Sequence, residues 1–368
     1  MSGRSDSLNR DVARQVLSKT LRVRRGENVI IEAWSEALPW AVPYVNEARR
    51  LGARPLMLYE DEDAFWEALD TGVSRATGQV GDHEWRAMEE SDAYVFFFGP
   101  SGWPRYDDLP DRKTAGVAAY NAEWYRRAAK AKIRGARMYL GRTSPAAAER
   151  WKVDLDAWRD ALQQASLASP QRMHQLGSRI SERLRRGRTV RVTHDDGTDL
   201  EFRLGRYPVQ LDDGLVDEKD LRVGNNMATI PGGVVGVAIN HTSARGSVVG
   251  NHRTYPNAGP AEGIRWAFDG GALAEHSYQK GGEAFEKAYS EAPRKGRDRL
   301  SYFSVGLNPD LSGCPQMEDQ ELGAVLLRIG GNAFVGGKNP SPFGSWAIVT
   351  GADVSVDGRP LVKRGTIV

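Results

Sequence analysis

The sequence has little of what marks several large classes of protein. Its one cysteine, Cys314, excludes an intramolecular disulfide bond and a zinc site built from several cysteines. The 50 lysines and arginines are balanced by 48 aspartates and glutamates, so the chain lacks the positive charge that binds nucleic acid. No apolar run approaches the roughly 18 residues that a membrane-spanning helix needs. We therefore expect a small-molecule partner, with neither nucleic acid nor membrane involved.

The beginning of the sequence also lacks a targeting signal. Residues 1–24 are polar and charged and contain no apolar run of the kind found in signal peptides. A single cysteine fits a reducing compartment. Both observations favour the cytoplasm as the location of the protein.

The composition is that of a folded protein, with 40% hydrophobic and 27% charged residues, and 368 residues predict two domains. In the first half, helical patterns alternate with short apolar strands at residues 29–33, 55–59, 93–99 and 136–140. Two further helices are expected over residues 145–164 and 170–186. This order predicts an α/β, Rossmann-like domain with a mostly parallel sheet over residues 1–186.

The pattern changes after residue 186. Residues 189–193 and 200–204 alternate between apolar and polar side chains, and Asp195, Asp196 and Gly197 supply a turn between them, which predicts a β-hairpin. Further strand and turn signals follow to the end, with one helix near residues 281–292. Residues 187–368 are therefore expected to form a mostly antiparallel α+β domain.

Six stretches of the second half carry a resemblance to a known family. They are residues 190–206, 230–235, 244–249, 305–309, 318–330 and 336–349, which include Gly197-Thr198, Ile230-Pro231-Gly232-Gly233, Arg245-Gly246 and Leu307-Asn308-Pro309. Their order and spacing resemble those of the thermophilic metalloaminopeptidases (aminopeptidase T/S), a superfamily that also includes 2,5-dihydroxypyridine 5,6-dioxygenase. The resemblance implies an N-terminal α/β domain, an aminopeptidase T-like catalytic domain and a homodimer.

The chain departs from that family at its metal ligands. Relatives hold two divalent metals with carboxylates, histidines and a tyrosine. The matching positions here are Val234, Tyr302, Leu326 and the pair Gly344 and Trp346, or Ser345 and Ala347 if the register moves by one. Divalent cations need carboxylate or imidazole donors, which aliphatic side chains cannot replace. A conventional two-metal aminopeptidase is thus not expected, and no cofactor is assigned, although a rebuilt divalent site stays open.

One acidic cluster remains at the position where the family has its general base. Within residues 318–321, either Asp319 or Glu321 matches that glutamate, depending on the subgroup whose spacing is used. A carboxylate that faces an apolar cavity has a raised pKa and can transfer protons without a metal. The alternative interpretation is a solvated loop that has outlived its role.

Other candidates lie outside this cluster, and two of them, His241 and His252, bracket the stretch of residues 244–249. His241, His252 and Tyr302 are the expected catalytic partners, because histidine titrates near neutrality. The expected substrate-binding residues are Trp34, Trp103, Arg253, Tyr255 and Trp346. Tryptophans would form a cavity for a flat ligand, and Trp346 would occupy space at the lost metal site. The alternative for each is ordinary packing or surface exposure.

The function hypothesis is a divergent enzyme of this family that acts on a small molecule, aromatic or heterocyclic, by metal-independent acid–base or hydrolytic chemistry. Two alternatives stay open. One is a ligand-binding protein without turnover, and the other is a hydrolase or oxygenase with a rebuilt single-metal site.

Overall fold

The computed structural model describes residues 3–71, 81–102, 105–106, 109, 111–254 and 259–368. Contacts divide the chain into two compact units, the first formed by residues 1–170 and 214–231 and the second by residues 171–213 and 232–368. The sequence pattern placed one boundary near residue 186. In the structure, residues 171–186 group with the second unit, and the chain returns to the first unit for residues 214–231. None of the described helices combines the length and the apolar character needed to cross a membrane.

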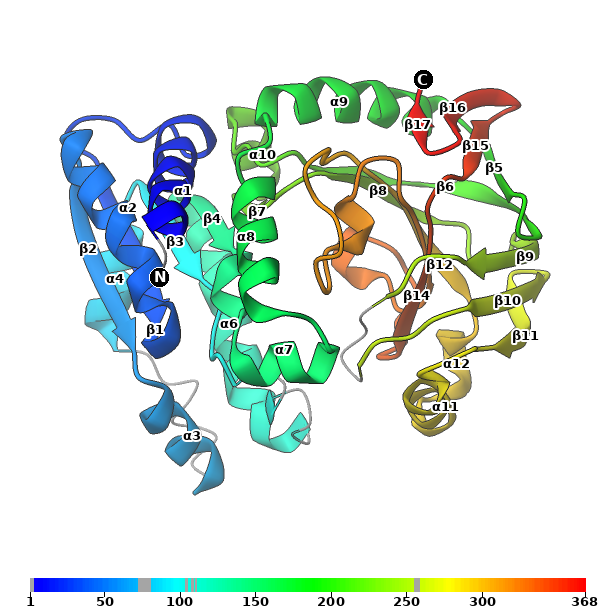
Figure 1. Cartoon of the computed structure of the whole chain (residues 1–368), viewed down its shortest axis with the longest axis horizontal. Coiled ribbons are helices and arrows are strands. Elements are labelled where there is room, and N and C mark those ends of the chain that lie inside the picture. Colours follow the sequence, from blue (N-terminus) through cyan, green and yellow to red (C-terminus); the bar gives the residue numbers. More distant parts are fainter. Residues whose placement is uncertain (1–2, 72–80, 103–104, 107–108, 110, 255–258) are drawn as a thin grey trace. The chain divides into compact units, whose positions relative to one another are not determined.

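The first unit is built on a five-stranded parallel sheet of order β2-β1-β3-β4-β7 (Figure 1). Its strands are β1 (Asn28–Trp34), β2 (Arg54–Glu60), β3 (Ala93–Phe97), β4 (Arg134–Met138) and β7 (Met227–Ile230). The described helices are α1 (Gly3–Gln15), α2 (Leu38–Arg50), α3 (Glu62–Asp70), α4 (Asp82–Glu89), α6 (Asp111–Ala131), α7 (Pro145–Trp151), α8 (Leu155–Ala165) and α10 (Glu218–Val223), with shorter turns η1 (Val16–Thr20), η2 (Ser35–Ala37) and η4 (Tyr139–Arg142).

Helices cover both faces of this sheet, which explains why its central strands are apolar without alternation. On one face, Ile30 and Tyr94 pack against Met88 of α4 and Trp124 of α6. On the other face, the ring of Phe97 meets Tyr44 of α2 edge-on, with 5.1 Å between ring centroids. The α/β prediction for the first half is confirmed.

One predicted helix proves to be two. The sequence pattern gave a single helix over residues 145–164, but α7 ends at Trp151 and α8 begins at Leu155. Lys152 adopts a left-handed conformation with φ of 54°, which ends the first helix. The carboxylate of Asp154 then accepts a hydrogen bond from the Ala157 N–H and caps the second helix.

The second unit is a mostly antiparallel, twelve-stranded sheet with helical insertions, as the sequence predicts. Its strands are β5 (Thr189–His194), β6 (Thr198–Asp212), β8 (Val234–Ile239), β9 (Arg245–Gly250), β10 (Ile264–Asp269), β11 (Ala272–Ser277), β12 (Leu300–Gly306), β13 (Val325–Gly330), β14 (Gly344–Val349), β15 (Asp353–Val356), β16 (Arg359–Lys363) and β17 (Thr366–Ile367). The described helices are α9 (Pro170–Arg186), α11 (Gly282–Glu291) and α12 (Arg294–Arg297), with turns η5 (Glu318–Gln320) and η6 (Ala333–Val335).

Strand β6 joins two parts of this sheet. Its first half pairs with β5 in the predicted hairpin, and its second half pairs with β8, after which β12, β13 and β14 follow in order. Because side chains alternate along a strand, this β6-to-β14 part has two faces. Val237, Phe303 and Leu327 are paired in register on one face and are buried to 1% exposure or less. That face forms the core of the unit.

Candidate functional site

The opposite face of the same strands carries the candidate site. Tyr302 pairs with Ala238 on one side and with Arg328 on the other, and Arg328 pairs with Trp346. Alternation places the residues two positions along each strand on the same side. We call this side the site face and define it by Asp212, Val234, Gly236, Ala238, Tyr302, Ser304, Leu326, Arg328, Gly344, Trp346 and Ile348.

The positions matched to the metal ligands of relatives meet on the site face. Val234, Tyr302 and Leu326 lie there together with Gly344 and Trp346, whereas Ser345 and Ala347 point to the core side. The first of the two possible registers therefore keeps all these positions on one face.

The side chains at these positions do not fit the metal centre that the resemblance implies. Valine, leucine, glycine and tryptophan offer no ligand atom to a hard divalent cation. Within the described parts of the chain, no three histidine, cysteine, aspartate or glutamate side chains come together as a metal site. We therefore derive no chemical step through a metal.

Tyr302 is held at the centre of the site face. It is 7% exposed, and its hydroxyl lies directly above Gly236, where a Cβ atom would fall 2.0 Å from the phenolic oxygen. Burial raises the pKa of the Tyr302 phenol, and the nearby charge of Asp319 raises it further. The phenol therefore stays protonated at neutral pH and can donate a hydrogen bond. Its ring also contacts Phe334 of η6, at 5.7 Å between centroids.

Asp319 is the carboxyl group best suited to proton transfer. It lies on η5 and is partly buried. Burial raises the pKa of Asp319 from 3.8 to about 6, and the charge of Asp212 adds to the rise. A group with a pKa near 6 is mostly ionised at neutral pH yet remains basic enough to accept a proton from a substrate.

Of the two glutamates of this acidic cluster, Glu318 is buried and Glu321 is partly buried, so the cluster is not a solvated loop. Glu318 is 2% exposed, and Oε1 of its carboxyl group accepts a hydrogen bond of 3.1 Å from the Gln316 N–H. Burial raises the pKa of Glu318 to about 8. Glu318 therefore carries its proton at neutral pH, whereas Asp319 does not.

Glu321 and His252, 69 residues apart in the sequence, meet in the fold. Oε1 of Glu321 lies 3.3 Å from Nε2 of His252 and also accepts a 2.9 Å hydrogen bond from the Gly313 N–H. The two side chains are 12% and 25% exposed. A carboxylate that bonds one ring nitrogen fixes the orientation and tautomer of an imidazole. Both residues were candidates in the sequence analysis, but their direct contact was not predicted.

The structure does not bring His241 to the cluster. His241 follows the end of β8, and the strand rise puts it roughly 20 Å from Val234. Glu321 lies near Val234, because its backbone crosses over Gly306, the partner of Val234 in the sheet. Nδ1 of His241 is buried, and no hydrogen-bond partner for it occurs among the described residues.

Three of the five expected ligand-binding residues can be placed, and each has a different setting. Trp346 lies on the site face. Arg253 is occupied by a surface ion pair with Glu262, to which its Nε donates at 2.7 Å. Trp34 belongs to the first unit, where its ring packs over Gly99, which favours the packing interpretation.

Two further predictions cannot be placed. Trp103 and Tyr255 lie outside the described residues.

Three residues of the site were missed in the sequence. Arg328 lies beside Tyr302, Phe334 covers both, and Asp212 acts electrostatically on Asp319 and Tyr302. A usable signal existed for Arg328, because it is the one charged residue in the apolar strand β13. Asp212 and Phe334 had no such signal, since their roles depend on strand register and on a turn.

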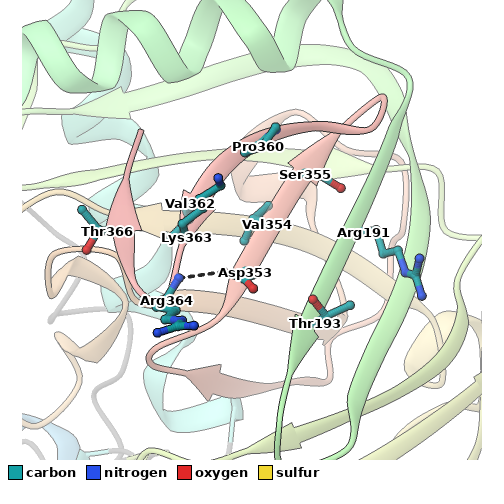
Figure 2. Close-up of a pocket in the computed structure, with 10 residues that line it drawn as sticks. All are labelled: Arg191, Thr193, Asp353, Val354, Ser355, Pro360, Val362, Lys363, Arg364 and Thr366. Atoms are coloured by element: carbon teal, nitrogen blue, oxygen red, sulfur yellow. Dashed lines mark hydrogen bonds between the residues drawn. The ribbon is translucent and has the colours of Figure 1, made fainter.

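A groove of about 740 Å³ lies elsewhere in the second unit, on β5 and the strands β15 to β17 (Figure 2). Its lining includes Arg191, Lys363 and Arg364, and Asp353 accepts a 2.7 Å hydrogen bond from the Arg364 backbone N–H. Arg191 is already paired with Asp199 at 2.7 Å. The groove is an open sheet surface, and none of the site residues expected from the sequence lines it.

Comparison with known proteins gives relatives in structure only. No protein-family model and no curated protein matches the sequence. Wild-type AmpT from Thermus thermophilus matches with a TM-score of 0.70 and 19% identity, over 99% of each chain. 2,5-Dihydroxypyridine dioxygenase from Pseudomonas putida KT2440 matches with a TM-score of 0.64 and 16% identity, over 100% of this chain and 98% of the other. The resemblance found in the sequence is thus confirmed at the level of structure, and this chain has the fold of AmpT and of 2,5-dihydroxypyridine dioxygenase.

Proposed function

We propose that this chain is an enzyme that acts on a small organic molecule at the site face, by acid–base or hydrolytic chemistry that needs no metal. One observation carries the proposal, namely the partly buried Asp319 carboxyl, whose pKa rises to about 6 beside a protonated phenol. Carboxyl groups with such values cluster at functional sites, because proton transfer at neutral pH requires them.

The residues support a division of roles. Asp319 accepts a proton from the substrate or from an attacking water. Tyr302 donates its phenolic hydrogen bond to the substrate oxygen that becomes negative, and its burial makes that bond stronger than it would be in water. His252, oriented by Glu321, is the second proton carrier and returns a proton to the leaving group.

The structural relatives favour a small-molecule enzyme without fixing the reaction. One is named as an aminopeptidase, aminopeptidase T, and the other as a 2,5-dihydroxypyridine dioxygenase. A single fold thus serves different chemistries, so the reaction must be inferred from the site itself. Of the positions matched to the metal ligands of relatives, Tyr302 is the one that carries an acid–base group here.

The test is turnover by metal-free protein. Purified chain without a histidine tag is analysed for zinc, cobalt, manganese and iron, then assayed against small aryl amides, esters and lactones. We expect conversion without bound metal, a loss of at least about 100-fold in kcat in Asp319→Asn, and a loss of about 10-fold or more in Glu321→Gln. Asp195→Asn, an exposed turn variant of the second unit, is the matched control and should keep full activity.

The outcomes separate the alternatives. Unchanged turnover in Asp319→Asn and Glu321→Gln, with folding intact, would refute the acid–base roles. A stoichiometric metal on which turnover depends would return metal chemistry to first place. Tight binding of a ligand that is never converted would make the chain a binding protein.

A further inference from the structure

Arg328 is a cation on the site face. It is partly buried within β13, where Leu327 and Ile329 on either side are fully buried, and burial lowers the pKa of its guanidinium. Its Nε donates a 3.2 Å hydrogen bond to the carbonyl of Gly331. In the part of the chain that the structure describes, no carboxylate forms an ion pair with this side chain.

Such an arrangement is costly for the folded protein. Buried charges are normally paired, because losing hydration without gaining a counter-charge is unfavourable. Asp212, the carboxylate of the site face, does not supply the pair, because it lies opposite Val234 at the start of β8, whereas Arg328 is in register with Tyr302 and with Ala238 near the end of that strand. Tyr302 pairs with Arg328 across the sheet, and the negative charge of Asp319 also acts on its phenol and raises the pKa. The site face therefore has an acidic end and a separate basic end.

The basic end is also lined by aromatic rings. The guanidinium carbon lies 5.1 Å from the centre of the Phe334 ring and 6.0 Å from that of Trp346. Phe334 is 65% exposed, which is unusual for phenylalanine and leaves its outer surface free for contact. Gly344 allows the guanidinium to lie close against β14, because a Cβ atom there would fall 2.0 Å from Nη2.

We propose that Arg328 anchors a carboxylate of the substrate, and that the substrate is a small aromatic or heteroaromatic carboxylate whose ring packs against Phe334 or Trp346. A guanidinium can bind a carboxylate with two parallel hydrogen bonds, which supplies the missing counter-charge and fixes the orientation of the ring. The inference rests on the proposed function, because it takes the site face as the substrate site. It adds the chemical class of the substrate and the residue that selects it.

Ligand-observed fluorine NMR tests the proposal with a matched pair of probes, 4-fluorobenzoate and the uncharged 4-fluorobenzamide, on the full chain. We expect the benzoate to bind at millimolar concentration and the benzamide to bind at least about tenfold more weakly, because only the benzoate supplies a charge. Arg328→Met should weaken benzoate binding about tenfold or more, and Arg328→Lys, which keeps the charge but loses the two-pronged geometry, should weaken it less. Arg265→Met, at an exposed site on β10, should change nothing.

A second readout separates a ligand anchor from a structural arginine. Without ligand, Arg328→Met should keep or raise the thermal midpoint, since an apolar side chain replaces an unpaired cation among apolar neighbours. A lowered midpoint with unchanged benzoate binding, equal binding of the two probes, or no benzoate binding would each overturn the proposal. If inorganic phosphate displaced 4-fluorobenzoate as readily as benzoate does, the claim that the ligand is aromatic would be overturned.

The binding test stands apart from the test of catalysis, because it is made at equilibrium. Benzoate binding that persists in an inactive Asp319→Asn variant would support the role of Arg328 as an anchor. Benzoate binding by a wild-type chain that shows no turnover at all would refute the proposed catalysis but not the anchor. Turnover of uncharged substrates with no preference for carboxylates would support the enzyme and refute the role of Arg328 as an anchor.

Discussion

Asp319→Asn should make the protein more stable while removing its activity. The pKa of Asp319 rises from 3.8 to about 6 on folding, chiefly through burial. One pKa unit corresponds to about 1.4 kcal/mol, so the ionised carboxylate destabilises the folded state by up to about 3 kcal/mol. Asparagine has nearly the same shape and carries no charge. At pH 7.5 we expect the variant to gain about 1–3 kcal/mol in free energy of unfolding.

The sign of the pH dependence follows from the two pKa values. Below pH 3.8 the carboxyl is protonated in both the folded and the unfolded chain, so the wild type and the variant should be equally stable. Between pH 3.8 and about 6 the unfolded chain ionises first, and the destabilisation of the wild type builds up. Above about pH 6 the destabilisation is complete, and the gain of the variant should be constant.

Urea unfolding at pH 4, 5, 6 and 7.5, followed by circular dichroism, measures this difference. Asp195→Asn serves as the control, because this exposed carboxylate should give the same small change at every pH. A variant that is less stable than wild type at pH 7.5, or whose gain does not depend on pH, would refute the assignment of a strained carboxyl to Asp319. Gain of stability with loss of turnover is the usual trade-off at a functional site.

Two other substitutions test neighbouring features. Gly236→Ala should lower the free energy of unfolding by about 1–3 kcal/mol and displace Tyr302, because the new Cβ would fall 2.0 Å from the Tyr302 hydroxyl. Gly250→Ala is the control and should cost less, because the nearest atom to its new Cβ would be 3.2 Å away. Equal urea midpoints of the two variants would contradict the contact between Gly236 and Tyr302. In the first unit, burial raises the pKa of Glu32, which accepts a hydrogen bond from Tyr94, to about 8. Stability should therefore fall further between pH 4.5 and 8 in the wild type than in Glu32→Gln, which keeps the contribution of Glu318, as denaturation at pH 5 and 8.5 would show.

The fold was largely predictable because its signals are local. The helix over residues 170–186 is α9, and the hairpin beginning at Thr189 is β5 and β6. The break between α7 and α8 was missed, because the left-handed conformation of Lys152 leaves no trace in apolar periodicity. The capping carboxylate of Asp154 was the one local sign of that break.

The site was less predictable because it depends on pairing between distant segments. The resemblance of the sequence to the family pointed to Asp319, Glu321 and Tyr302, which do lie in or beside the site face. The contact of Glu321 with His252 depends on the packing of a loop after β9 against η5, and no spacing rule gives it. His241 precedes a stretch that resembles the family in sequence, but it follows β8 at the end far from Val234.

Strand β7 has a consequence for how the chain must be made. Its parallel partner β4 ends at Met138, but β7 itself begins only at Met227, after α9, β5 and β6 have been synthesised. On a ribosome that adds about 5–20 residues per second, the first sheet therefore waits several seconds for its last strand. During that interval the edge of β4 is open to other chains, which is an aggregation hazard. A recombinant fragment that stops at residue 186 would keep this open edge permanently, whereas one that rejoins residues 214–231 by a short linker would close it.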